Sequence, residues 1–131
     1  MYQNSTKLSD NCLIPKSKWC KEHREAYDFC NHVLYSGKVS ANQFLSYIKK
    51  HIYPHFKEEE NISFPYVLKK YPEAKNSTIQ LLNEHVLFRK YMRNIMNSSD
   101  YDFILINVIA FCERLKSHIK KEENYFSKFC I

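Results

Sequence analysis

The stretch HFKEEENISFP, residues 55–65, has a later counterpart in HIKKEENYFSKF, residues 118–129. In both stretches a glutamate follows a histidine by four positions, a second glutamate comes directly after it, and aromatic residues follow. Residues four positions apart lie on one face of an α-helix, so each pair would direct an imidazole and a carboxylate toward the same point. With 14 acidic residues among 131, such a spacing also arises by chance. What lies at the same depth of the fold therefore decides whether the repeat has a function.

Apolar residues recur three and four positions apart along most of the chain, which is the pattern of amphipathic helices. Gly37 can end the first helix in a left-handed conformation, and Ser40 can cap the second. A third helix starts at one of residues 76–78, and the sequence NSSD at residues 97–100 ends it. The predicted helices are residues 16–36, 40–70, 76–96 and 101–129. The predicted inward face of the second helix comprises Phe44, Ile48, Ile52, His55, Glu59 and Ile62.

The content of turn-forming residues indicates the fold class. A single glycine and four prolines provide little material for β-hairpin turns, which favours helices. Short connections make successive helices antiparallel, so we predict an all-α fold, an up-down-up-down four-helix bundle. A chain of 131 residues is long enough to bury a core of its own. We expect residues 1–131 to form a single domain, with residues 1–15 as an irregular N-terminal arm.

Composition argues against several classes of protein. The longest apolar run, residues 103–111, is too short to cross a bilayer. The N-terminus lacks the basic start and apolar block of a secretory signal, so we expect a cytoplasmic protein. Five cysteines without any C-x-x-C motif suit reduced thiols better than disulfides or a zinc site, and three are expected in the core: Cys20, Cys30 and Cys112. The net charge of +6 is spread over lysines and arginines interleaved with glutamates, so neither nucleic acid nor a membrane is an expected partner.

Each predicted helix carries one histidine on its inward face: His23, His55, His85 and His118. Counted from the helix ends at about 1.5 Å per residue, the four reach one level of the bundle to within about one turn. Glu59 and Glu122 belong to parallel, diagonal helices and would face each other across the axis. A buried row of imidazoles and carboxylates is unfavourable unless a charged or hydrogen-bonding partner satisfies it. We therefore predict a dinuclear metal site with four histidine ligands and two bridging glutamates.

Other residues near the six predicted ligands are expected around the metal site rather than in it. His32 falls on the opposite face of the first helix and is expected at the surface. His51 precedes His55 by one turn and is expected either at the surface or beside the site. Pro54 removes a backbone hydrogen bond and should kink the second helix. The neighbouring glutamates are expected to contact the ligands or solvent: Glu58, Glu60 and Glu123.

Four segments of the chain resemble the hemerythrin-like, HHE cation-binding family: KEHREAYDF, HFKEEENISFPYV, LNEHVLFRKYM and SHIKKEENYF. The resemblance extends over about residues 19–129. Within the family the chain is most similar to the repair-of-iron-centres (RIC) di-iron proteins, whose second helix reads much like H-x3-E-E-x-x-L-F-P. The resemblance implies two iron ions with an oxo or hydroxo bridge. It also implies the same ligands: His23, His55, His85 and His118, with Glu59 and Glu122 bridging.

One position departs from the oxygen-carrying hemerythrins, which have a further histidine one turn after the ligand of the third helix. This chain has Arg89 there, and a guanidinium is not a metal ligand. Each iron would keep two imidazoles and the shared carboxylates. Both irons would then have an open position, which favours chemistry over reversible oxygen carriage.

The leading expectation is a RIC-like protein of oxidative or nitrosative stress that binds dioxygen, nitric oxide or peroxide and supplies iron to damaged iron–sulfur proteins. One alternative is a hemerythrin-type module that senses or stores oxygen or iron. Another is an interaction protein with a zinc or empty site, because imidazole and carboxylate also suit zinc and manganese. No residue receives a catalytic role, and the sequence leaves open whether the protein is an enzyme.

Overall fold

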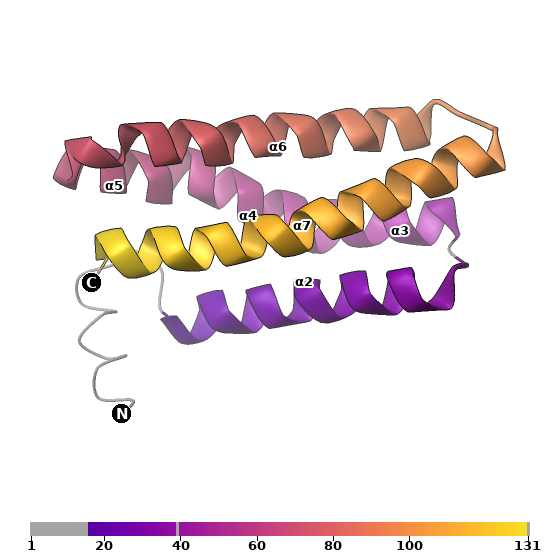
Figure 1. Cartoon of the computed structure of the whole chain (residues 1–131), viewed down its shortest axis with the longest axis horizontal. Helices are drawn as coiled ribbons and strands as arrows, with labels where there is room; N and C mark the ends of the chain where they lie inside the picture. The colour runs from indigo at the N-terminus through magenta and orange to yellow at the C-terminus, as the bar shows by residue number, and fades with distance from the viewer. Residues whose placement is uncertain (1–15, 39, 131) are drawn as a thin grey trace.

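The computed structural model describes the backbone of residues 16–38 and 40–130 and the side chains of residues 20–38 and 40–129. The expected N-terminal arm, Cys12 and the side chain of Cys130 lie outside this part. The described residues form helices and contain no strand, so the predicted all-α class is confirmed. Long helices form three of the four sides of the bundle: α2 (Lys16–Ser36), α6 (Lys75–Met96) and α7 (Tyr101–Cys130). Figure 1 shows them side by side with the second predicted helix.

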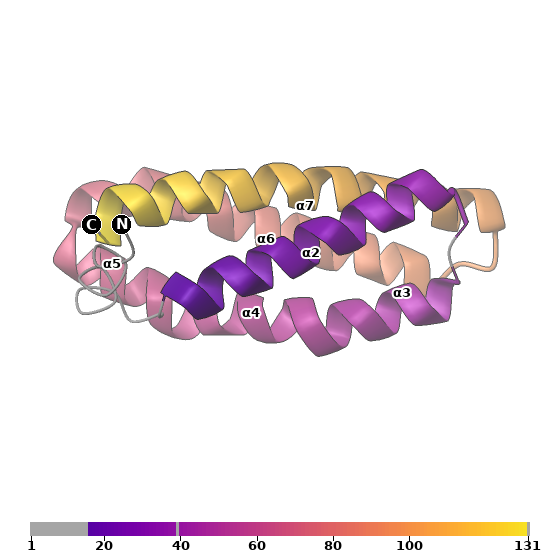
Figure 2. The same ribbon diagram turned by 90° about the horizontal axis from the view of Figure 1, so that it is seen from below.

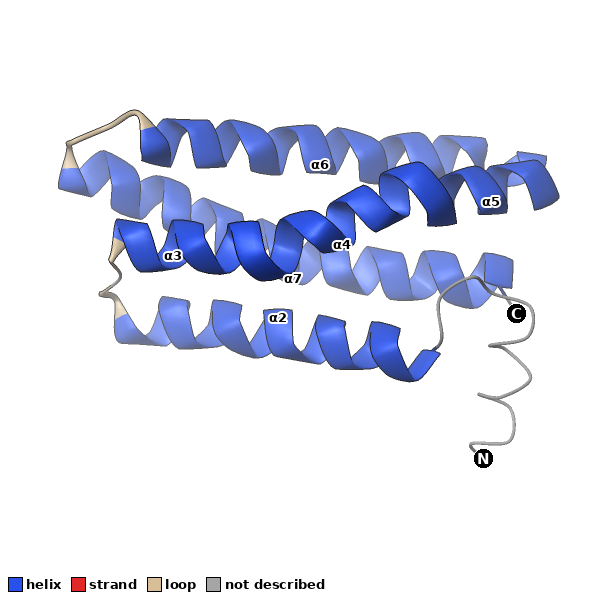
Figure 3. Ribbon diagram, turned by 180° about the vertical axis from the view of Figure 1, so that it is seen from behind, coloured by secondary structure: helices blue, strands red, loops and turns tan. Residues whose placement is uncertain are grey.

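The second helix alternates between α-helical and π-helical turns. Its segments are α3 (Ala41–Tyr47), π-helical η1 (Ile48–Ile52), α4 (Tyr53–Glu58), π-helical η2 (Glu59–Ser63) and α5 (Phe64–Lys70). Each π-helical segment ends two residues before a proline, Pro54 or Pro65. A proline ring clashes with the carbonyl four residues earlier, and a wider turn relieves the clash. The predicted kink at Pro54 is therefore a π turn, and Figure 3 shows the helix bending between α3 and α5.

The π turns change which side chains point inward, because each adds a residue to the turn. The buried residues of this helix are Phe44, Ile48, Ile52, Phe56, Glu59, Ser63, Phe64 and Val67. The predicted inward position of Ile62 is wrong, since this side chain is 50% exposed. The extra residue of η2 turns Ser63 and Phe64 into the core instead. The same turn leaves Glu59 fully buried.

Short connections join the helices in the predicted antiparallel order. Gly37 ends α2 with a positive φ of 62°, as expected for a left-handed helix terminus. The Ser40 side chain accepts a hydrogen bond from the Gln43 N–H and so caps α3. A short 3-10 helix, η3 (Pro72–Ala74), leads into α6. Figure 2 shows α2 lying between α7 and the α3–α4 segment, as in an up-down-up-down bundle.

The core consists of two apolar clusters separated by a polar layer. Along α6, Leu81 belongs to the smaller cluster and Phe88 to the larger, and buried His85 lies between them. Along α7, Leu115 and Tyr125 belong to the larger and smaller clusters in the same way. Buried polar side chains from all four helices fill the layer between the clusters.

The cysteine predictions are confirmed in two of three cases. Cys30 and Cys112 are fully buried free thiols in the larger cluster. Cys20 is only partly buried, so its predicted place in the core is wrong. Among the described helices, none has the length and apolar character that a membrane crossing requires.

Candidate metal centre

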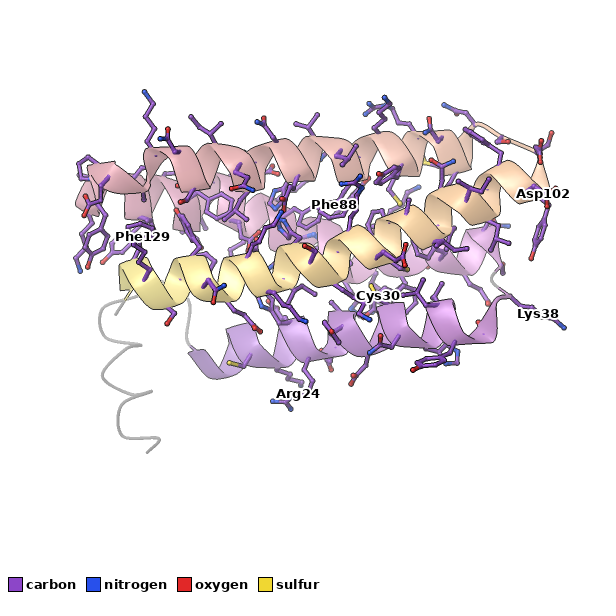
Figure 4. The ribbon with its side chains drawn as sticks, in the orientation of Figure 1. Arg24, Cys30, Lys38, Phe88, Asp102 and Phe129 are labelled. Carbon is purple, nitrogen blue, oxygen red and sulfur yellow. The ribbon has the colours of Figure 1, made fainter. Side chains whose placement is uncertain are left out.

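All six predicted ligands lie together in the polar layer. Two groups of four side chains can each hold a metal ion, and within each group the ligand atoms lie within 4.8 Å of one another. The first group, here called position 1, contains His23, His55 and both glutamates. The second, position 2, contains His85, His118 and the same two glutamates. Figure 4 shows side-chain nitrogen atoms gathered beside Phe88, whose ring centroid lies 5.3 Å from that of His118.

The two glutamates each direct one oxygen toward each position. Glu59 Oε2 lies 2.9 Å from His55 Nε2, and its Oε1 lies 3.2 Å from His85 Nε2. Glu122 Oε1 lies 3.1 Å from His23 Nε2, and its Oε2 lies 2.9 Å from His118 Nε2. A carboxylate that serves two positions through separate oxygens has the arrangement of a bridging ligand.

The contacts of Glu59 test whether a cation fits. Both carboxylate oxygens are buried and close to imidazole nitrogens, yet neither makes a hydrogen bond of acceptable geometry. A buried carboxylate without such a partner is unfavourable, and a metal ion satisfies oxygen and nitrogen lone pairs that converge on one point. Imidazole and carboxylate donors suit iron, zinc and manganese. The residues therefore fit a pair of such cations.

The carboxylates attract positive charge into the core. Burial acts to lower the pKa of His118, but the charge of Glu122 and hydrogen bonds to Glu122 and Glu84 outweigh it and raise the pKa to about 9. Burial acts to raise the pKa of Glu122, but the charge of His118 and hydrogen bonds from surrounding histidines hold it well below its usual range. Protons and metal cations therefore compete for the same imidazoles.

The other ring nitrogen of each histidine, Nδ1, faces a glutamate of another helix. The Nδ1–oxygen pairs are His55–Glu22 at 2.9 Å, His85–Glu60 at 2.6 Å, His118–Glu84 at 2.6 Å and His23–Glu123 at 3.7 Å. Sequence reasoning placed Glu60 and Glu123 near the ligands or in solvent, and both lie near a ligand. It missed Glu22 and Glu84, because both reach across to the next helix. A glutamate directly before an inward-facing histidine is the signal that could have revealed them.

Arg89 lies beside the site without pointing into it. Its guanidinium donates to both oxygens of Glu60, at 2.8 and 3.0 Å. Burial acts to raise the pKa of Glu60, but hydrogen bonds from Arg89 and His85 outweigh it and lower the pKa. Oxygen carriers have a further histidine at this position. In this chain the residue there, Arg89, binds the carboxylate of Glu60 instead.

Two voids lie near position 1. A cavity of about 20 Å³ is bordered by His23, His55 and Glu122, by His118 of position 2 and by several apolar side chains. An open groove of about 360 Å³ lies outside it, and both voids are lined by Glu22, His51, Ile52 and His55. Exposed His51 therefore lines both voids beside the site. His32 is exposed at the surface as predicted. Glu58 is partly buried and also lines the groove.

Comparison with known families agrees with this geometry. The hemerythrin HHE cation-binding domain family matches residues 16–130, the part of the chain that forms the four sides of the bundle. Neither the curated proteins nor the solved structures gave a significant match. The chain belongs to the hemerythrin HHE cation-binding family.

Proposed function

We propose that the protein is a cytoplasmic non-haem di-iron protein with a RIC-like role in oxidative or nitrosative stress. His23 and His55 would hold one iron, His85 and His118 the other, and Glu59 and Glu122 would serve both. The observation that carries this proposal is that the two ligand groups share both carboxylates. When bound, two iron ions supply redox chemistry toward dioxygen, nitric oxide or peroxide.

The side chains around position 1 favour a small ligand. A cavity of about 20 Å³ accommodates roughly one water-sized molecule. Apolar residues line it together with the ligands: Ala26, Ile52, Phe56, Leu115 and Ile119. A void of this size and lining suits a diatomic molecule, whereas a larger metabolite would not fit. The groove past His51 and Ile52 supplies the access route.

The absence of a third imidazole at position 2 supports reaction over storage of the ligand. Arg89 occupies the place of the further histidine, donates to Glu60 and supplies no metal ligand. Among the described residues, each position therefore has two histidines and the shared carboxylates. A RIC-like role in the repair of iron centres is the corresponding biological proposal, with damaged iron–sulfur proteins as recipients of iron.

Exposure of the reduced, iron-loaded protein to dioxygen and to nitric oxide tests this function. Stopped-flow visible spectra should show rapid oxidation in air and consumption of nitric oxide. Stable oxygenation that reverses when dioxygen is removed would contradict the stress role. That result would support the alternative of an oxygen-sensing or oxygen-storing module.

The affinity for Fe²⁺ should rise with pH, because a protonated imidazole cannot bind a cation. The raised pKa of His118, about 9, extends this competition well above the ordinary histidine range near 6.5. We therefore expect the apparent affinity to increase from about pH 6 to pH 9 and to fall again on acidification. Anaerobic competition with a chelator at each pH measures the trend, and proton release on loading provides a second readout. A flat profile without proton release would contradict the ligand assignment.

A further inference from the structure

The glutamates that face Nδ1 connect the helices in cyclic order. Glu22 of α2 contacts His55 of α4, and Glu60 of η2 contacts His85 of α6. Glu84 of α6 contacts His118 of α7. The cycle closes where Glu123 of α7 approaches His23 of α2. Each helix thus contributes one glutamate that contacts the ligand histidine of the next helix. In the sequence, each of these glutamates is adjacent to a predicted metal ligand of its own helix.

Such a contact fixes the state of the imidazole. When Nδ1–H donates to a carboxylate, the lone pair of Nε2 remains available on the other side of the ring. The Nε2 atoms of His55 and His85 face Glu59, and those of His23 and His118 face Glu122. The outer glutamates therefore orient all four rings toward the positions that Glu59 and Glu122 bridge.

The contacts of this cycle are unequal. Around position 2, Glu60 is held by two hydrogen bonds from Arg89, and Glu84 is held by Lys121. Around position 1, Glu22 lies 2.9 Å from His55 Nδ1, whereas Glu123 is 49% exposed and its oxygen lies 3.7 Å from His23 Nδ1. The groove is lined by His55 of position 1, and the cavity by His23 and His55 together with His118 of position 2. The contact between Glu123 and His23 is thus the longest of the four, and it belongs to position 1.

We propose that Glu22, Glu60, Glu84 and Glu123 form an orienting ring that makes the two ion positions unequal. Position 2 retains its ion because Arg89 and Lys121 hold its orienting glutamates. Position 1 releases its ion first because the contact between Glu123 and His23 is long and exposed. Arg89 is a positioning residue that acts through Glu60. This inference rests on the proposed metal centre.

Release of Fe²⁺ to a chelator under anaerobic conditions tests the ring. The wild type should lose one ion per chain about ten-fold faster than the other. Glu60→Gln and Arg89→Met should each accelerate release from position 2 by about 10- to 100-fold, the usual effect of removing the partner of a ligating histidine. The slow phase should therefore merge with the fast phase or overtake it, while release from position 1 keeps its wild-type rate. The double variant should release no faster than Glu60→Gln, because both changes break one contact. Glu113→Gln and Arg93→Met, at exposed positions of α7 and α6, are the matched controls.

A spectroscopic measurement separates orientation from general loosening. In the Zn²⁺-loaded protein, ¹H–¹⁵N spectra should show slowly exchanging Nδ1–H signals for His55, His85 and His118 and faster exchange for His23. Glu60→Gln should accelerate exchange at His85 alone. A variant that merely destabilises the bundle would accelerate exchange at all four histidines, and that result would overturn the positioning role.

The outcomes distinguish the ring from the proposed function. Two ions that leave the wild-type protein at one rate, or a Glu60→Gln variant that behaves as the wild type in both measurements, would overturn the ring and leave the metal centre intact. A protein that binds neither Fe²⁺ nor Zn²⁺ would overturn both. Two-phase release with zinc alone would support the ring and contradict the iron proposal.

Discussion

Glu59→Gln is expected to weaken the binding of both metal ions by more than about 100-fold, beyond the 10- to 100-fold effect of losing an outer partner. Glu59 supplies one oxygen to each position, at 2.9 Å from His55 Nε2 and 3.2 Å from His85 Nε2. Glutamine has nearly the same shape but only one acceptor oxygen and no charge, so it cannot serve both positions. Competition with a chelator measures the loss, and Glu113→Gln is the surface control.

The same variant should be less stable than the wild type when both are stripped of metal. Burial acts to lower the pKa of His55, but the charge of Glu59 and hydrogen bonds to surrounding glutamates raise it well above its usual range. Replacing Glu59 by a neutral group of equal size leaves this buried imidazole without its counter-charge, and removing one partner of a buried ion pair is destabilising. Thermal melts of the stripped proteins provide this comparison. Undiminished binding of two ions by Glu59→Gln would contradict the bridging role.

Removal of metal from the wild type should lower its melting temperature by about 10 °C. An ion present at 100 times its dissociation constant stabilises the folded state by about 2.7 kcal/mol, and each kcal/mol corresponds to a few degrees in a domain of this size. The six ligands come from four helices, so the ions also connect the sides of the bundle. Scanning calorimetry of loaded and stripped protein gives the difference.

Glu59→Gln provides the control for this measurement. Its melting temperature should be independent of added Fe²⁺ at concentrations that stabilise the wild type. Equal melting temperatures of loaded and stripped wild type would show that no ion is bound by the folded core, and would contradict the proposed centre.

The sequence predicted the helices and the convergence of the six side chains because both follow from periodicity and depth. Helical spacing placed His23, His85 and His118 on inward faces, and Gly37 marked the first turn. Antiparallel order then aligned the four histidines at one level. Neither step requires knowledge of side-chain conformation.

Periodicity failed where the helix departs from 3.6 residues per turn. The π turns before Pro54 and Pro65 shift the inward face, so Ile62 lies outside and Phe64 inside. Two π turns within one helix cannot be inferred from apolar spacing alone, although the prolines indicate where strain arises. Cys20 likewise departs from the predicted core, since it is only partly buried.

The partner of each outer glutamate could not be assigned from the sequence because the contacts cross between helices. Glu84 lies beside His85 in the chain but contacts His118, and Glu22 contacts His55 in the same manner. Arg89 shares this property, since its partner Glu60 belongs to another helix. Such pairings depend on the rotation of each helix about its axis, which the three-dimensional arrangement supplies.

The metal content of protein produced with ample iron, measured together with its visible spectrum, tests the central claim most directly. The proposed centre predicts two iron ions per chain and the visible absorption of ferric iron in air. It also predicts that Glu59→Gln loses both ions while Glu113→Gln keeps them. One ion per chain, or stoichiometric zinc without visible absorption, would contradict a di-iron centre built on Glu59 and Glu122.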